Sequence, residues 1–250
     1  MRTARYAKFC APVVLVAVAG CGQYPSHKIG DGVKAALPQV IGPADTWAVD
    51  VSGNQGTILG GRVPEVAING VNVQVSPQLN MSGLNIDAKN IRVDIAKKSL
   101  KSIDSLTFSG ALTQANLDRY LRLTSGDDPD RPKKLAISLR RDDLLISFKY
   151  EALGISVPVK VAGRMYVSPT TDDKIDLHPT SAAVAKISMP RKLLEFQMRG
   201  VNPIMDLGTM KFPVHLSNIH VADRMLVFSG KAEVPASAIA AAQEQISNAK

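Results

Sequence analysis

The sequence predicts an α+β fold in which a long, curved antiparallel β-sheet wraps around two short-to-medium helices. From residue 46 onward, apolar and polar residues alternate over most of the chain, which is the period of a half-buried β-strand. Two segments, 112–121 and 188–200, keep helical spacing instead. Both helices are short and rich in apolar residues, so we expect each of them to pack against the sheet.

The N-terminus predicts a lipoprotein signal peptide over residues 1–20. Three basic residues precede an apolar run, 9–19, that is shorter than the roughly 20 residues needed to cross a bilayer. The run ends in the tetrapeptide VAGC, which resembles the bacterial lipobox. We therefore expect Cys21 to be the first mature residue, diacylated on its sulfur and carrying palmitate. The alternative is a soluble secreted protein with an incidental cysteine.

Such an anchor predicts a membrane-bound lipoprotein on the extracytoplasmic side of the cell envelope. Gly22, rather than the Asp associated with inner-membrane retention, follows the cysteine, which favours the outer membrane if the source is Gram-negative. Cys10 would leave with the signal peptide. The mature chain then has no other thiol, which suits an oxidising compartment.

The composition is that of a globular protein with one core. The 250 residues are 45% hydrophobic and 21% charged, and we expect one domain. Aromatic residues make up only 5%, fewer than base-stacking proteins use, so we expect no nucleic-acid partner. The net charge of +8 suits an anionic lipid surface or simply serves solubility.

The first half of the chain predicts one helix and then strands. Residues 21–45 read as a tether followed by a short amphipathic helix that ends near Pro38. Asn69-Gly70 predicts a hairpin turn. The apolar parity changes between Ile86 and Ile91, which predicts a bulge or a turn. The expected strand faces are Trp47, Val49 and Val51; Val71, Val73 and Val75; Leu84 and Ile86; Ile91, Val93 and Ile95.

The helix over 112–121 carries its own start signals. Thr113 is the expected N-cap, and Leu112 and Leu117 have the spacing of a hydrophobic staple. Leu117, Tyr120 and Leu121 share one apolar face. A polar loop, 122–134, follows.

The second half predicts more strands around a second helix. That helix, 188–200, has Ser188 as its expected N-cap and Gly200 as its stop. Residues 202–208 are expected to add a turn of helix. The expected strand faces are Leu135, Ile137 and Leu139; Leu144, Ile146, Phe148 and Tyr150; Ile155, Val157, Val159 and Val161; Val214 and Leu216; Ile219 and Val221; Leu226 and Phe228.

The order of these motifs resembles the LmeA family of phospholipid-binding envelope proteins. The resemblance rests on "L.I.A.NIRVD", on "SLTFSGALTQANLDRYL", on the Asn202-Pro203 step and on a closing strand pair from Pro213 to Gly230. It implies a tubular lipid-binding fold, in which a curved antiparallel sheet holds a long helix and a groove takes acyl chains. The implied lipid-binding-like α+β domain is 46–234, followed by an Ala/Gln-rich helix or tail, 235–250.

We therefore expect a phospholipid partner, held in an apolar groove for lipid transport or envelope maintenance. The candidate groove residues are Leu117, Tyr120, Leu121, Phe148, Val159, Leu193 and Phe196. Basic or hydroxyl groups at the mouth would set headgroup preference. For each residue, plain core packing is the alternative. A structural envelope lipoprotein with a closed core and a protein partner is the alternative function.

The sequence shows no constellation for catalysis. His215 and His220 are five residues apart in predicted strand, on opposite parities, which is poor geometry for a shared metal. The motifs of zinc proteases, redox cysteines, phosphate loops and serine hydrolases do not occur. Residues 125–130, "SGDDPD", lack the spacing of a calcium loop. We expect no enzyme activity, no metal and no cofactor.

Overall fold

The structure is a computed structural model of the whole chain. It describes residues 26–94, 99–125, 136–141, 143–152, 155–184, 187–188, 202–210, 212–222 and 224–233. The predicted signal peptide, Cys21, the helix after Ser188 and the segment 235–250 lie outside the described residues.

Two antiparallel sheets form the body of the protein. The strands of the first, sheet A, are β1 (Thr46–Ser52), β2 (Arg62–Gln74), β3 (Asn80–Asp94), β4 (Ser99–Ser102), β5 (Ser105–Thr113), β12 (Val214–Ala222) and β13 (Met225–Ala232). Those of the second, sheet B, are β6 (Ala136–Arg140), β7 (Asp143–Ala152), β8 (Ile155–Val167), β9 (Lys174–Val184), β10 (Ile187–Ser188) and β11 (Met205–Asp206). Sheet A runs in the order β1-β2-β3-β5-β13-β12 with β4 beside β3, and sheet B runs β10-β9-β8-β7-β6 with β11 beside β9.

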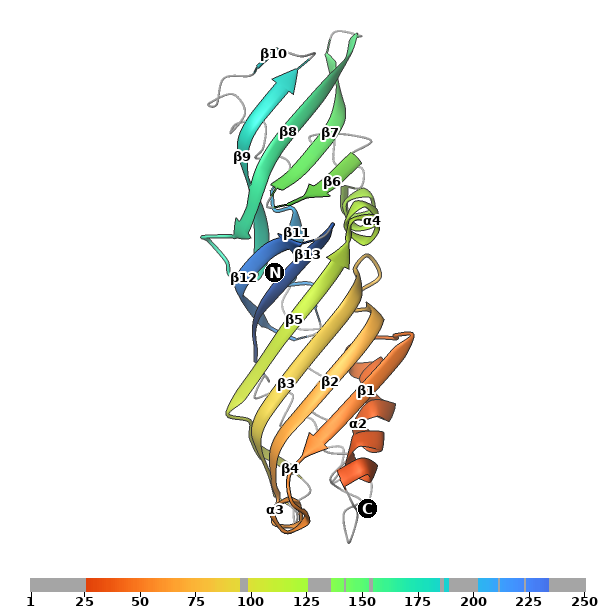
Figure 1. Cartoon of the computed structure of the whole chain (residues 1–250), viewed down its shortest axis with the longest axis vertical. Helices are drawn as coiled ribbons and strands as arrows, with labels where there is room; N and C mark the ends of the chain where they lie inside the picture. Colours follow the sequence, from red (N-terminus) through yellow and green to blue (C-terminus); the bar gives the residue numbers. More distant parts are fainter. Residues whose placement is uncertain are drawn as a thin grey trace, which may run out of the picture.

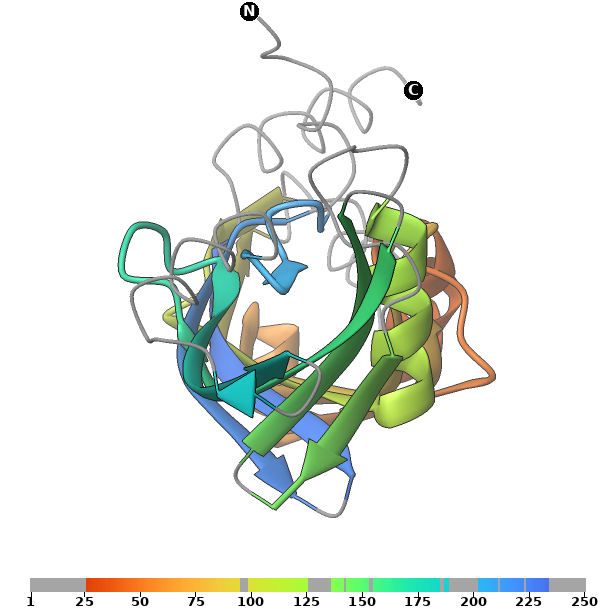
Figure 2. The same ribbon diagram turned by 90° about the horizontal axis from the view of Figure 1, so that it is seen from above.

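The sheets lie end to end along the long axis of the molecule (Figure 1). Viewed along that axis, the strands curl around an open centre (Figure 2). The described helices are α2 (Ser26–Val40), α3 (Gln55–Leu59) and α4 (Gln114–Ser125). Helix α2 lies beside β1, and α4 lies at the junction, touching β3 and β5 of sheet A and β6 of sheet B (Figure 1). Curved antiparallel sheets with few helices are confirmed, whereas one sheet wrapped around two helices is not.

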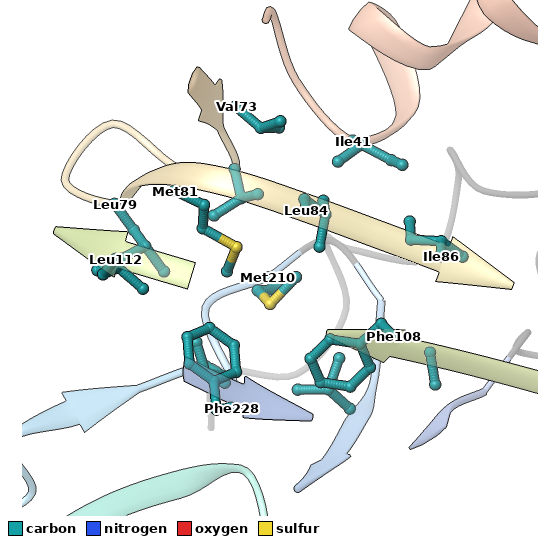
Figure 3. Close-up of a cluster of buried hydrophobic side chains, with 14 of the residues drawn as sticks. Ile41, Val73, Leu79, Met81, Leu84, Ile86, Phe108, Leu112, Met210 and Phe228 are labelled. Atoms are coloured by element: carbon teal, nitrogen blue, oxygen red, sulfur yellow. The ribbon is translucent and has the colours of Figure 1, made fainter. Parts of the chain in front are cut away.

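The core of sheet A is made by the inward-facing side chains of its central strands. The rings of Phe108 on β5 and Phe228 on β13 meet edge to face, with centroids 6.3 Å apart. Met210 lies between these rings and the β3 side chain Leu84 (Figure 3). Gly110 leaves room for the Phe228 ring, because a Cβ there would lie 2.5 Å from its Cζ atom.

In each of two strands, one residue with a left-handed backbone conformation changes which alternate side chains face the core. Asn90 in β3 has a φ of 52°, and it separates buried Ala88 from buried Ile91. The predicted change of parity is therefore made inside one continuous strand, by a residue type that tolerates positive φ. Asn72 in β2, also at 52°, does the same. Val71 is therefore 48% exposed while Val73 is buried, so the predicted common face of 71–75 is wrong.

The predicted turn at Asn69-Gly70 is also wrong, because both residues lie within β2. Gly70 is needed for packing instead. A Cβ at this position would lie 2.5 Å from Cζ3 of Trp47, so the absence of a side chain lets the indole approach the sheet.

Helix α4 begins as predicted. The Asn116 amide donates to Thr113 Oγ1 over 3.2 Å, and Leu112 and Leu117 are fully buried. The helix continues to Ser125, so residues 122–125 are helical rather than part of the predicted loop, and the rest of that loop lies outside the described residues. Asp118 and Arg122 form an ion pair one turn apart on its exposed side.

Hydrogen bonds join α4 to sheet B. Gln114 Oε1 accepts from the Leu139 amide on β6 over 3.1 Å, and Tyr120 Oη accepts from the Asp206 amide over 3.1 Å. Residues 205–206 form β11 rather than the predicted turn of helix. The Asn202 side chain both accepts from and donates to the backbone of Leu177, which holds this segment against β9.

A histidine on β12 joins sheet A to the turn between β8 and β9. His215 Nδ1 lies 2.9 Å from Asp172 Oδ2, and the amide of Leu216 donates to Asp172 O over 2.7 Å. The hydrogen bond to Asp172 raises the pKa of His215, and the charges of Asp172, Glu233 and Asp173 act in the same direction against partial desolvation. Protonated His215 therefore stabilises the junction.

We predict that this junction weakens as the pH rises. The folded pKa of His215 lies above the ordinary value of about 6.5, so its contribution is complete below that value and is lost as pH rises through the folded pKa. Urea unfolding of the wild type between pH 5 and 9 should show this decline, and His215→Gln should flatten it. Asp172→Asn should flatten it in part, because Glu233 and Asp173 still raise the pKa of His215, and a decline that survives His215→Gln would exclude His215 as its source.

Candidate functional site

An apolar pocket of about 120 Å³ lies between α2 and the inner face of sheet A. Each of its walls comes from a different part of the chain. The lining residues are Ile29, Val33, Leu37, Val40 and Ile41 from α2 and its end, Val63, Val66 and Ile68 from β2, Ile86, Ala88 and Ile91 from β3, Ile103, Leu106 and Phe108 from β5 and the turn before it, and Phe212, Ala232 and Glu233. Among these described residues, Glu233 is the only charged one.

Helix α2 forms the cover of this pocket. Ile29, Val33, Leu37 and Val40 follow one another at helical spacing, and all four are buried, as the sequence predicts. The backbone approaches β1 closely, because a Cβ at Gly30 would lie 3.4 Å from the carbonyl oxygen of Val49. The cover therefore depends on apolar contact with the sheet.

Little in α2 itself favours the helix. Gly30 and Gly32 each cost about 1 kcal/mol relative to alanine, and Pro38 lies inside the last turn. The first turn has no acidic residue and the last turn no basic one, so no side-chain charge complements the helix dipole. Tertiary packing must therefore supply most of the stability of α2.

The pairing of β5 with β13 stops shortly before the two strands end, beside residues that line the pocket, and we call this end of the ladder the split. The two strands are paired only from Thr107 opposite Lys231 onward, although β5 begins at Ser105 and β13 ends at Ala232. Leu106 and Ala232, which would form the next pair, are therefore not paired with each other.

A second hollow, of about 610 Å³, lies at this split. It shares Ile103, Leu106, Ala232 and Glu233 with the apolar pocket, so the two spaces are contiguous. Its remaining lining is largely polar: Leu100, Ser102, Asp104, Ser105, His215 and Lys231. The apolar pocket thus adjoins a more polar, charged hollow, which we call the vestibule.

The charges of the vestibule are partly paired. His215 Nε2 lies 3.4 Å from Glu233 Oε1, a charge contact without hydrogen-bond geometry, while Nδ1 is held by Asp172. Within the described ranges, the side chains of Lys231 and Asp104 have no ion-pair or hydrogen-bond partner. Both are exposed, so both can meet a ligand.

The candidate groove residues from the sequence lie elsewhere. Leu117, Tyr120 and Leu121 are buried on α4, Val159 is buried on β8, and Phe148 on β7 is half-buried against the core. The structure brings the three α4 residues together at the junction, but none of the five lines the apolar pocket. Leu193 and Phe196 lie outside the described residues. A lipid-binding role for these seven residues stays a prediction.

The apolar faces of the two later predicted helices favoured a groove beside those helices, and so the pocket beside α2 was not predicted. One sequence signal could have indicated this pocket. Helix α2 has an apolar stripe of four residues, and because β1 follows it closely, that stripe must pack on the sheet that contains β1. The split between β5 and β13 has no sequence signal, since it depends on where the pairing of two distant strands stops.

Other classes of site find no support in the described part of the chain. It contains no group of three or more His, Cys, Asp or Glu side chains placed to hold a metal ion. None of its helices is both long enough and apolar enough to span a membrane.

Comparison with known proteins gives one match. The family model described as LmeA-like phospholipid-binding matches residues 16–231, which is most of the chain. No curated protein and no solved structure matches significantly. All residues that line the apolar pocket and the vestibule, except Ala232 and Glu233, lie within the matched range. The chain belongs to the LmeA-like phospholipid-binding family.

Proposed function

We propose that the protein binds a phospholipid by placing an acyl chain between α2 and sheet A. The observation that carries this proposal is the apolar pocket, which is contiguous with a polar vestibule. Each buried methylene group contributes roughly 0.8 kcal/mol, so even part of an acyl chain supplies useful affinity. The polar part of the lipid then stays at the split between β5 and β13, in contact with water.

Binding requires α2 to move outward. The pocket measures about 120 Å³, whereas sites for drug-sized ligands measure about 300–1,000 Å³. An apolar cavity of about 150 Å³ holds a benzene-sized group, so the closed pocket admits only part of a chain. A helix with two glycines and a proline, held mainly by apolar packing, is suited to be displaced by another apolar surface.

We further propose that the protein is an envelope lipoprotein anchored through Cys21 on the extracytoplasmic side of a membrane. The support for this is the order of basic start, apolar run and VAGC tetrapeptide in the sequence. A lipid-binding domain tethered at a membrane surface would serve lipid transport or envelope maintenance.

One observation favours the alternative of a structural lipoprotein that acts through a protein partner. The small volume of the pocket is that of an imperfectly filled core, which needs no ligand. Lipid uptake by the purified protein separates the two functions.

We predict that filling the pocket abolishes most lipid uptake. In Ala88→Phe the ring would fill most of a pocket of this size, so an acyl chain would lose the burial of at least two methylene groups and affinity should fall at least about tenfold. The measurement is saturable uptake of a fluorescent phospholipid by the protein starting at Gln23. Its matched control is Ala67→Phe on the neighbouring strand, which is half-buried, does not line the pocket and should bind as the wild type does.

Circular dichroism should show the same fold for both variants. A wild-type protein that shows no saturable uptake and carries no lipid after purification would overturn the binding proposal. Equal uptake by the two variants would instead place the acyl chain outside this pocket.

The anchor has its own test. Cys21→Ser removes the sulfur that would be acylated, so the protein should move from the membrane fraction to the soluble fraction in its native host. Fractionation followed by immunoblotting measures this, with Cys10→Ser as the control that should stay with the membrane. If the Cys21→Ser protein remains with the membrane, the lipoprotein proposal fails.

A further inference from the structure

We infer that the vestibule selects a phospholipid whose headgroup carries a primary ammonium beside its phosphate, as ethanolamine phospholipids do. This inference rests on the proposed function and adds the class of lipid. It is drawn from the number, sign and placement of the charged groups at the split between β5 and β13.

The vestibule pairs cationic and anionic side chains in equal number. The cationic side chains are Lys231 and His215, and the anionic ones are Asp104 and Glu233. His215 is already engaged by Asp172 and Glu233, so the groups left to meet a ligand are the lysine and the Asp104 carboxylate. One exposed cation and one exposed anion complement a zwitterion better than they complement a ligand with a single sign of charge.

The placement of these two groups fits a headgroup that leaves the pocket through the split. Lys231 stands opposite Thr107 at the last pair of the β5–β13 ladder. Asp104 precedes the first residue of β5, on the other side of the gap. A phosphate that emerges beside Leu106 and Ala232 therefore meets the Lys231 ammonium on one side, with the hydroxyls of Ser102 and Ser105 available as donors.

The Asp104 carboxylate then determines which group beside the phosphate is bound best. A primary ammonium donates hydrogen bonds to a carboxylate, as a lysine side chain does. A quaternary ammonium has no such donor and is recognised by aromatic faces, and the described residues of the vestibule include no Phe, Tyr or Trp. An anionic headgroup with no amine would leave Asp104 beside a like charge.

The test offers the purified full chain mixed vesicles that hold equal amounts of phosphatidylethanolamine, phosphatidylcholine and phosphatidylglycerol with identical acyl chains. The protein is re-isolated and its bound lipids are counted by mass spectrometry. We expect phosphatidylethanolamine to be enriched about twofold to fivefold over each of the other two, the size of effect that an exposed charge pair supports.

Two substitutions test the separate roles proposed for Asp104 and Lys231. Asp104→Asn should bring the enrichment close to parity without lowering total bound lipid, whereas Lys231→Gln should lower the binding of all three lipids by a similar factor. Their matched controls are Asp50→Asn on β1 and Lys160→Gln on β8, which are exposed and lie away from the vestibule. Thermal unfolding confirms that each variant is folded.

The failures of the two proposals are distinguishable. A wild-type protein that retains none of the three lipids overturns the proposed function itself. A protein that retains lipid without favouring phosphatidylethanolamine, or that keeps this preference in Asp104→Asn, overturns the headgroup assignment while phospholipid binding stands.

Discussion

The apolar inner face of sheet A is the constraint on which the rest of the structure depends. The strands β2, β3, β5 and β13 all turn apolar residues to this side, and a sheet with such a face must be covered. Helix α2 from one end of the chain and Met210 and Phe212 from near the other end provide the cover. Burial of this face draws the hairpin of β12 and β13 next to β5, and β12 in turn holds sheet B through His215 and Asp172.

The same cover explains how a stable fold could admit a lipid. The centre of sheet A is rigid, with fully buried side chains such as Phe228 and Leu84 packed against one another. Helix α2 has weak intrinsic preference and is held mainly by apolar contact, so an acyl chain that offers equivalent apolar surface can replace part of that contact. The split between β5 and β13 gives the polar end of a lipid a way out without opening the rest of the sheet.

Local patterns in the sequence predicted local structure well. Alternation placed most strands, and the cap at Thr113 and the stripe of α2 were correct because they depend on residues close together in the chain. The predicted turn at Asn69-Gly70 was wrong because Gly70 leaves room for the Trp47 side chain of another strand, and no local sequence pattern shows such a contact. The site was missed for the same reason: the pocket is made by α2 together with β2, β3 and β5, and the vestibule by the ends of β5 and β13, which lie more than a hundred residues apart.

The central claim is that an acyl chain lies between α2 and sheet A. It is tested most directly with a phospholipid that carries a photoreactive diazirine near the end of one acyl chain, cross-linked to the protein and mapped by peptide mass spectrometry. We expect adducts on the pocket-lining residues of α2, β2 and β3, such as Val33, Val66 and Ala88. Adducts confined to Leu117, Tyr120 or Leu121 of α4, or to Val159 in sheet B, would contradict it.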